Sequence, residues 1–510
     1  ANSGIETIAI DVEEGNATEL KFAGNATVKN IVVTGDGDLT IGIAPGLGDV
    51  ITTIEKFDAS AATGDITWTT GDLAKAATVL GGSGDDSFTI NGSKAFTVDT
   101  GAGDDEINIV KGAASNKLNV QAGEGDDVVV LTGSKLATTD VIDGGEGTDT
   151  VVVAGAATRA EGDFIVFNSL LKNFETLAFD GAEGTDAALD ASKLAANYTT
   201  LEFSDDSAVT NVGAQALVTH AGLTAQASGF KLGDGTTDTT YAGSLNITAE
   251  AVGGEALSGE IAANAESLTL NIDATQGDAE VALTGFVKSA DVTLTQGVND
   301  GDTPDASDDE LYSASLNLEV GGDAHPDLES LTLSGNGMAI VTNGEESKLA
   351  TVDASGLNSV DVNGDPAEGL IYMSMNALAE TISLGDGLDS ISLGASFYGA
   401  VNARTFDTVE GLNLVLDAGE LDLEASDVLT VEGVEDAEIF TTTQTDLDLA
   451  LTDAAAEYSG GAVVFHLGGD TYIYADTGDT DGVVDATDTL VKLVGTIDLD
   501  ALIVSLEGDI

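Results

Sequence analysis

Apolar residues that begin short strand-like segments recur along this chain at nearly constant intervals. Successive members are 19 to 26 residues apart, and each is followed by alternating apolar and polar residues. Such alternation is typical of β-strands. A strand that recurs every 22 residues or so predicts a β-solenoid, whose coils bury their apolar residues only by stacking on neighbouring coils. The predicted ladder consists of Phe88, Ile107, Val129, Val151, Leu177, Leu201, Leu223, Leu245, Leu268, Val292 and Leu316.

The ends of this ladder are less regular. Ile66 precedes Phe88 by 22 residues and extends the ladder toward the N-terminus. The intervals break after Leu316, which predicts a second β arm or a sandwich-like domain in the second half of the chain. Convincing helical stretches are few, and residues 213–222 are one short candidate. The predicted fold class is therefore all-β, with a parallel β-roll or β-solenoid as its main body.

The charge of the chain excludes nucleic acid as a general partner. The sequence holds 89 Asp and Glu against 16 Lys and Arg, a formal net charge of −73. Phosphate would be repelled almost everywhere, so no nucleic acid partner is expected. Self-repulsion of this size opposes compaction unless cations neutralise it. The chain has no cysteine, so disulfides and zinc–thiolate sites cannot supply stability.

Four glycine-rich nonapeptides lie at coil spacing in the first third of the chain. Residues 81–89 (GGSGDDSFT) and 144–152 (GGEGTDTVV) fit the pattern GGxGxDxUx, where U is a large apolar residue. Residues 100–108 and 122–130 lack only the first glycine, and residues 384–392 (LGDGLDSIS) form a later, isolated copy. Glycine permits the positive-φ conformations of tight turns and lets their carbonyl groups point inward. The repeated turns therefore predict a stack of oxygen-lined loops.

The sixth residue of each nonapeptide is an aspartate, which adds a carboxylate to those carbonyl groups. Hard oxygen ligands of both kinds are what Ca²⁺ takes. Stacked turns would place the aspartates in register, with about three calcium ions shared between four turns, and Asp85, Asp104 and Asp126 would add charge nearby. The predicted metal-binding residues are Gly82, Gly84, Asp86, Gly101, Gly103, Asp105, Gly123, Gly125, Asp127, Gly145, Gly147 and Asp149, together with Asp386 and Asp389 of the isolated copy.

Two other acidic segments have weaker patterns. Residues 299–310 contain six carboxylates, and residues 476–488 (DTGDTDGVVDATD) are spaced partly like an EF-hand loop. In the second segment Thr477 stands at the first ligand position, where an EF-hand has an aspartate. Both segments are interpreted as solvated acidic loops, with calcium binding as the alternative.

The nonapeptides resemble those of the RTX proteins, whose glycine-rich β-rolls bind calcium outside the cell. Within that group the chain is similar to the S-layer proteins of Gram-negative bacteria, through phrases such as NFETLAFDGAEGTD at 173–186 and VDASGL at 352–357. The stretch 468–502 resembles the ends of proteins exported by type I secretion, which carry an uncleaved C-terminal signal. The resemblance implies a secreted, calcium-loaded protein at the cell surface. No segment resembles the helical anchoring domain that some such S-layer proteins carry.

The chain is expected to comprise five regions. They are an N-terminal β region at 1–75, the calcium-binding β-roll at 76–160, a solenoid continuation at 161–325, a second β region at 326–460 and a C-terminal region with the secretion signal at 461–510. The partners expected are further copies of the chain in a two-dimensional lattice, and a glycolipid or polysaccharide of the cell surface. No apolar segment approaches the 20 residues or so of a membrane span, so no transmembrane insertion is expected.

Signs of an enzyme are weak. His220, His325 and His466 are scattered, and no HExxH or GxSxG motif is present. Without these motifs the sequence predicts neither a metalloprotease of that type nor an α/β-hydrolase nucleophile. Three hypotheses follow: a structural S-layer subunit first, a secreted adhesin or biofilm-matrix protein second, and a polysaccharide lyase or epimerase third. Arg159 and Arg404 are the only arginines and Trp68 the only tryptophan, which disfavours a uronate-binding enzyme.

Overall fold

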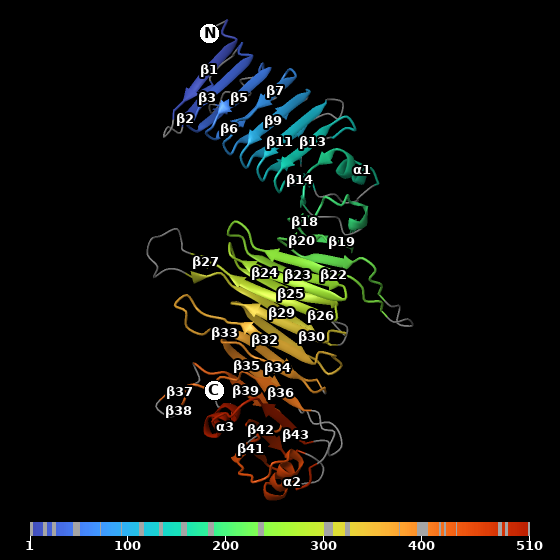
Figure 1. Ribbon diagram of the computed structural model, residues 1–510, viewed down its shortest axis with the longest axis vertical. Coiled ribbons are helices and arrows are strands. Elements are labelled where there is room, and N and C mark those ends of the chain that lie inside the picture. Colours follow the sequence, from blue (N-terminus) through green and yellow to red (C-terminus); the bar gives the residue numbers. More distant parts are fainter. Residues whose placement is uncertain are drawn as a thin grey trace. The chain divides into compact units, whose positions relative to one another are not determined.

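The chain forms a parallel β-solenoid of about 16 turns, seen here in a computed structural model (Figure 1). The chain divides near residue 210 into two compact units: residues 1–210 with 214–218, and residues 211–213 with 219–510. The structure describes residues 4–13, 18–22, 27–43, 52–71, 73–92, 94–111, 117–131, 136–154, 161–181, 188–232, 239–299, 310–321, 327–376, 378–394, 406–417, 420–422, 425–434, 436–477, 482–484 and 488–507.

The first unit consists of two parallel sheets whose strands alternate along the chain (Figure 1). One sheet contains β1 (Thr7–Val12), β3 (Asn30–Gly35), β5 (Lys56–Ala62), β7 (Ala77–Leu80), β9 (Phe96–Ala102), β11 (Leu118–Glu124), β13 (Val141–Glu146) and β15 (Leu171–Lys172). The other contains β2 (Thr18–Phe22), β4 (Leu39–Ile43), β6 (Ile66–Thr69), β8 (Ser87–Gly92), β10 (Glu106–Lys111), β12 (Val128–Val130), β14 (Thr150–Ala154), β16 (Thr176–Asp180), β18 (Thr200–Phe203) and β20 (Ala216–Thr219). The elements α1 (Glu161–Ser169), β17 (Leu189–Asp190), η1 (Ala191–Lys193) and β19 (Ser207–Val212) lie between these strands in sequence.

Alternate residues of these strands point inward and fill the space between the two sheets. Ile31, Phe57, Val79 and Val98 come from one sheet and Phe88 from the other, and none of the five is measurably exposed. Trp68, also buried, stacks on Phe57 with ring centroids 4.4 Å apart. Each coil therefore completes its core with the coil before and after it, as a solenoid requires.

The second unit repeats this arrangement. One sheet contains β21 (Leu223–Ala227), β23 (Leu257–Asn264), β25 (Ala279–Phe286), β29 (Ala314–Val320), β31 (Met338–Asn343), β33 (Glu368–Ser374), β35 (Leu388–Leu393) and β39 (Val428–Val431). The other contains β22 (Ser244–Glu250), β24 (Ser267–Ala274), β26 (Ser289–Gln296), β30 (Ser330–Gly335), β32 (Thr351–Leu357), β34 (Thr381–Ser383) and β36 (Asp407–Glu410). Two short antiparallel pairs, β27 (Val298–Asn299) with β28 (Glu310–Leu311) and β37 (Leu416–Asp417) with β38 (Glu420–Leu421), interrupt the coils.

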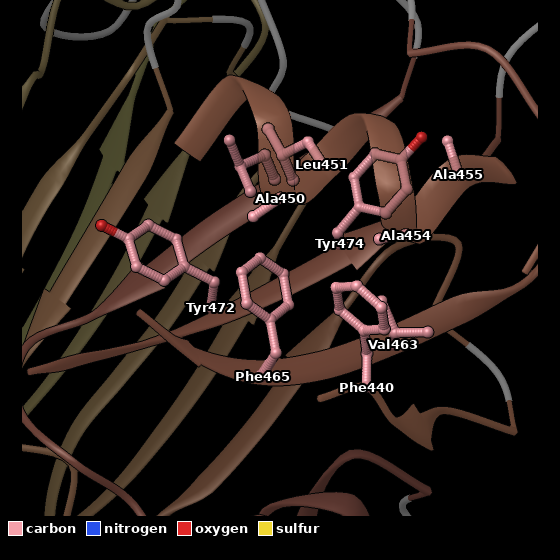
Figure 2. Packing of buried hydrophobic residues seen from close by; sticks show 10 residues of the cluster. Phe440, Ala450, Leu451, Ala454, Ala455, Val463, Phe465, Tyr472 and Tyr474 are labelled. Atoms are coloured by element: carbon pink, nitrogen blue, oxygen red, sulfur yellow. The ribbon is translucent and has the colours of Figure 1, made fainter. Parts of the chain in front are cut away.

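The last 75 residues or so depart from the parallel pattern. Strand β43 (Thr489–Leu493) joins β36 in parallel, and β42 (Asp470–Ala475) and β41 (Ala462–Leu467) then add antiparallel. Strand β40 (Glu438–Ile439) pairs with β41, and α3 (Leu499–Glu507) packs against β39. Helix α2 (Leu447–Glu457) packs Ala450, Leu451, Ala454 and Ala455 against the aromatic side chains of this sheet, as Figure 2 shows. The buried cluster contains Phe440, Ala450, Leu451, Ala454, Ala455, Val463, Phe465, Tyr472, Tyr474 and Leu490.

The ladder predicted from the sequence is confirmed in the first unit. Six of its residues pair in succession in the sheet that contains β8: Phe88, Ile107, Val129, Val151, Leu177 and Leu201. The residue before Phe88 in this ladder is Trp68, so the choice of Ile66 was wrong by two positions.

The rest of the ladder is partly wrong. Leu245 pairs with Leu268, but Leu268 pairs with Ala290 and not with Val292. Leu223 and Leu316 lie in the other sheet, on β21 and β29. The predicted helix at 213–222 is also wrong, because residues 216–219 form β20. The parallel sheets continue through most of the region where a second arm or sandwich was expected.

Candidate metal centre: stacked carboxylate ladders

The four nonapeptides stack in register at one corner of the first unit. Their second-position glycines pair directly, with Gly101 opposite Gly123 and Gly123 opposite Gly145. Gly123 has φ +132°, and a Cβ atom on it would stand 2.0 Å from the carbonyl oxygen of Gly101. Fourth-position glycines approach the previous turn as closely: a Cβ on Gly125 would stand 2.2 Å from the oxygen of Gly103. The turns can stack this tightly only because these positions lack side chains.

This contact predicts the effect of adding one methyl group. Gly123→Ala should lower the stability of the first unit by about 3 kcal/mol, because it adds backbone strain at positive φ to a clash with main chain. The measurement is thermal unfolding followed by the emission of Trp68, the only tryptophan. The matched control is Gly181→Ala, at φ +91° with nothing within 4 Å of the added Cβ. Equal losses in the two variants would contradict the close-stacking argument.

The sixth-position aspartates form an inner ladder of buried carboxylates. Each Oδ1 accepts a hydrogen bond from the main-chain N–H of the preceding turn. The N–H groups of Asp86, Asp105 and Asp127 donate to the next aspartate at 2.7, 2.8 and 2.9 Å. Asp86, at the start, accepts from the N–H of Ile66 at 2.8 Å. All four carboxylates are at most 2% exposed.

The second carboxylate oxygens distinguish the first rung from the others. Oδ2 of Asp86 accepts a hydrogen bond from the Gly82 N–H at 3.0 Å. Oδ2 of Asp105, Asp127 and Asp149 is buried and has no hydrogen-bond partner. A buried, unpaired carboxylate oxygen is costly, and native structures place a partner, water or ion beside such groups. Among the described residues of this unit, the three orphaned oxygens are therefore the positions where a cation would supply the missing partner.

Burial and mutual proximity make these aspartates weak acids. Burial, with a smaller contribution from neighbouring carboxylates, raises the pKa of Asp86 to about 6 and the pKa of Asp105 and Asp127 to about 7. Burial also raises the pKa of Asp149, with Glu175 adding to the effect. A carboxylate with a raised pKa is one whose charge the surroundings do not compensate.

The fifth-position aspartates form a separate, outer ladder that is exposed to solvent. Here the hydrogen bonds run in the opposite direction: the N–H of Asp104 donates to Oδ1 of Asp85 at 2.9 Å, and the N–H of Asp126 to Oδ1 of Asp104 at 2.8 Å. Asp38 and Asp65 extend this ladder two turns toward the N-terminus. The nonapeptide search missed them, because Leu39 and Ile66 occupy the sixth position of those turns.

The inner ladder continues where the nonapeptides end. The N–H of Asp149 donates to Oε2 of Glu175 at 2.9 Å, so Asp149 is not the last rung. In the second unit, the N–H of Asp389 donates to Oδ1 of Asp427 at 2.9 Å, and the N–H of Leu370 donates to Oδ1 of Asp389 at 2.7 Å. The copy at 384–392 thus has a stacked neighbour, and Asp427 is a carboxylate that sequence reasoning missed. Asp386, by contrast, is exposed.

Asp389 shares the feature that singles out the first ladder. Its side chain is 2% exposed and its Oδ2 is buried without a hydrogen-bond partner. Burial raises its pKa, and burial raises the pKa of Asp427 to about 7.

The buried carboxylate of Glu380, which is stacked on Asp407 in the same unit, differs from that of Asp389 in its hydrogen bonding. Its carboxylate accepts hydrogen bonds from Tyr372, Ser374 and Asn343, so both oxygens have partners. Burial by itself therefore does not produce the orphaned oxygens.

The donor set fits a hard cation that takes most of its ligands from main chain. Among the described residues, no three His, Asp or Glu side chains converge as a metal-binding group. The turns instead bring carboxylate and carbonyl oxygens together. The position of a Cβ on Gly144 would lie 2.5 Å from Oδ2 of Asp149 and 2.3 Å from the carbonyl oxygen of Asn173. A carboxylate plus carbonyl oxygens is a ligand set suited to Ca²⁺.

The histidines do not form a site among the described residues. His220 Nδ1 pairs with the carbonyl oxygen of Glu250 at 3.0 Å, and His466 Nε2 with that of Ile497 at 2.7 Å. His325, Arg159 and Arg404 lie outside the described residues, as does most of the acidic loop at 299–310.

Comparison with known proteins adds no family. No protein-family model matches this chain, and no curated protein matches it either. Within the described residues no helix is both long and apolar enough to cross a membrane.

Proposed function

We propose that this chain is a calcium-loaded structural protein of the bacterial cell surface, a subunit that assembles with its own copies into an S-layer lattice. The observation that carries the proposal is the inner ladder, where Asp105, Asp127 and Asp149 each bury an unpaired oxygen in a stack of glycine turns. The residues that would hold calcium are these aspartates, their neighbours in the stack and the turn carbonyl groups. The resemblance of the nonapeptides to RTX proteins supports this assignment and implies a location outside the cell, where calcium is abundant.

Calcium would do two things in such a protein. It would compensate the buried carboxylates and so stabilise the folded coils, because a ligand that binds only the folded state adds to stability. It would also allow copies of a chain with net charge −73 to approach one another. Monovalent salt screens charge over about 10 Å at 0.1 M, but it does not bridge carboxylates.

A structural role accounts for more of the described residues than an enzymatic one. A lyase or epimerase acting on acidic sugars would need exposed aromatic and basic groups. Trp68 is 2% exposed and packed on Phe57 inside the first unit, so it offers no sugar platform. The ion pairs that the structure describes between lysines and carboxylates, such as Lys29 with Glu6 and Lys75 with Glu55, occupy basic groups that such a site would use.

Assembly should depend on calcium in a way that sodium cannot replace. We expect purified protein to form two-dimensional arrays when calcium is added and to remain dispersed in sodium chloride of equal ionic strength with chelator present. Assembly is measured by light scattering across both titrations and by electron microscopy of the end points. Arrays in sodium with chelator would contradict the proposal. Calcium binding without arrays would favour the adhesin or biofilm-matrix hypothesis.

A further inference from the structure

An apolar area lies on the outer face of the second unit, across the neighbouring strands β31, β33, β35 and β39, the last three of which Figure 1 labels. Alternate residues of these strands, such as Tyr372 and Ile391, are buried in the core, and the residues between them point outward. Met375 continues the outward series of β33, and its N–H donates to the carbonyl oxygen of Asn343 at 2.7 Å. In register, one outward row is Ile340, Ile371, Ser390 and Val428, and the next is Thr342, Met373, Ser392 and Thr430.

The side chains on β31 and β33 make this area apolar. Met373 is 44% exposed and Met375 is 58% exposed. Met338, two residues before Ile340, belongs to the same outward series of β31, so all three methionines of the chain lie here. We call the two rows, together with Met338 and Met375, the methionine face. Methionine adapts its shape to a partner, and a contiguous exposed apolar area is typical of an interaction site.

No residue of the methionine face is charged, although the chain holds 89 Asp and Glu. Acidic residues stand at its border: Glu319 on β29, Glu368 at the start of β33 and Glu432 after β39. Contact through the other sheet would instead set outward residues such as Asp291 and Glu410 against like charges. A chain with net charge −73 can therefore approach its own copy through the methionine face without opposing carboxylates. A centre depleted of charge inside a polar rim is the usual composition of a protein interface.

We infer that two copies of this chain pack against each other through the methionine face, sheet on sheet and about a two-fold axis. An axis along the strands, between β31 and β33, would lay β31 of each copy over β33 of the other, so that apolar side chains meet apolar side chains. Strands about 4.8 Å apart and rows about 6.6 Å apart give the face an area of about 400 Å² per copy. This is below the size of a standard interface, so the dimer is weak and reversible. The contact uses no metal ion and so goes beyond the calcium-dependent assembly proposed above.

Sedimentation equilibrium of the full chain measures this contact. We expect a monomer–dimer equilibrium with a dissociation constant on the order of 50 μM. Dimerisation should tighten as sodium chloride is raised from about 0.1 to 0.5 M, because salt screens the repulsion between copies. It should be the same in chelator and in calcium kept below the onset of array formation.

A charge placed on the methionine face should break the contact. Met373→Glu should weaken the dimer about tenfold or more, because it sets two carboxylates against each other in an apolar interface. The matched control is Thr332→Glu, which adds the same charge at an exposed, outward position of β30 in the other sheet and should leave the dimer unchanged. Should Met373→Glu unfold the second unit, Met375→Glu, beyond the end of β33, is the second variant.

Methionine oxidation gives a second readout on the unmodified protein. Dilute peroxide converts exposed methionine to its sulfoxide, and the chain has no cysteine to compete. Oxidation of Met373 and Met375, read by mass spectrometry, should slow severalfold as the protein concentration rises through the dimer range. Unchanged oxidation rates, or equal effects of Met373→Glu and Thr332→Glu on sedimentation, would overturn the inference. Monomers that bound phosphatidylcholine vesicles through Met373 would overturn it as well, because the face would then contact lipid and not a second copy.

Discussion

Exchanging Asp105 for Asn is expected to stabilise the calcium-free protein and to destabilise the calcium-loaded one. Asn keeps the oxygen that accepts the hydrogen bond from the Asp86 N–H, so the main-chain contact between turns survives. What changes is the charge. At pH 8 without calcium, Asp105 is ionised although it is 2% exposed and its surroundings raise its pKa to about 7. Removing that charge should raise the melting temperature by about 5 °C, since 1 kcal/mol corresponds to a few degrees in a unit of this size.

With calcium the sign reverses. Asp105 has a stacked aspartate on either side, so its carboxylate would serve two neighbouring ions. Each ion bound at a hundred times its dissociation constant stabilises the fold by about 2.7 kcal/mol. Losing a ligand from two sites should therefore lower the melting temperature by about 10 °C or more. Unfolding followed by the emission of Trp68 measures both effects, because Trp68 is packed in the same unit, one coil before Phe88.

The neighbouring residue supplies the control. Asp104→Asn makes the same chemical change one position away, in the exposed outer ladder, and also keeps its hydrogen-bond-accepting oxygen. It should change the melting temperature by no more than about 1 °C in either condition, as surface substitutions usually do. If Asp105→Asn destabilised the protein equally with and without calcium, the inner ladder would be a hydrogen-bonding device and not a metal site.

The register of the first unit could be predicted from the sequence because one strand position repeats there with little variation. Phe88 through Leu201 keep one apolar residue per coil in one sheet, so spacing alone identifies partners. The method fails in the second unit for a physical reason. Each coil carries two strands with the same alternation, and spacing cannot say to which sheet a strand belongs. Leu223 and Leu316 were therefore assigned to the wrong sheet.

The candidate site was found only where glycine accompanied aspartate. Glu175 and Asp427 continue the inner ladders without the glycine pattern, and a motif search passes over them. A simpler signal includes both: each ladder carboxylate stands two residues before a buried apolar residue that pairs in register. Asp149 precedes Val151 in this way, Glu175 precedes Leu177, and Asp427 precedes Leu429. Which oxygens lack partners could not be predicted, because that depends on the donors that packing brings to each carboxylate.

The second large effect concerns pH, and it should differ in sign with and without calcium. Without calcium, the inner aspartates are more easily protonated in the folded protein than in the unfolded chain, because burial raises the pKa of Asp86 to about 6 and of Asp105 and Asp127 to about 7. Stability contributed by such groups is fully present below the unfolded pKa of about 4 and is lost as pH rises through the folded values. The melting temperature in chelator should therefore fall between pH 5 and 8.

Calcium binds the ionised carboxylates, so protons compete with it over the same range. The melting temperature at fixed calcium should rise from pH 5 to 8, and the two curves should diverge by about 15 °C or more at pH 8 if about three sites are filled. Binding should also release protons near pH 6.5, which calorimetry in buffers of different ionisation enthalpy detects. The double variant Asp105→Asn, Asp127→Asn should flatten both curves, because it removes the two central titrating groups. Parallel curves with and without calcium would show that the buried aspartates titrate without binding the ion.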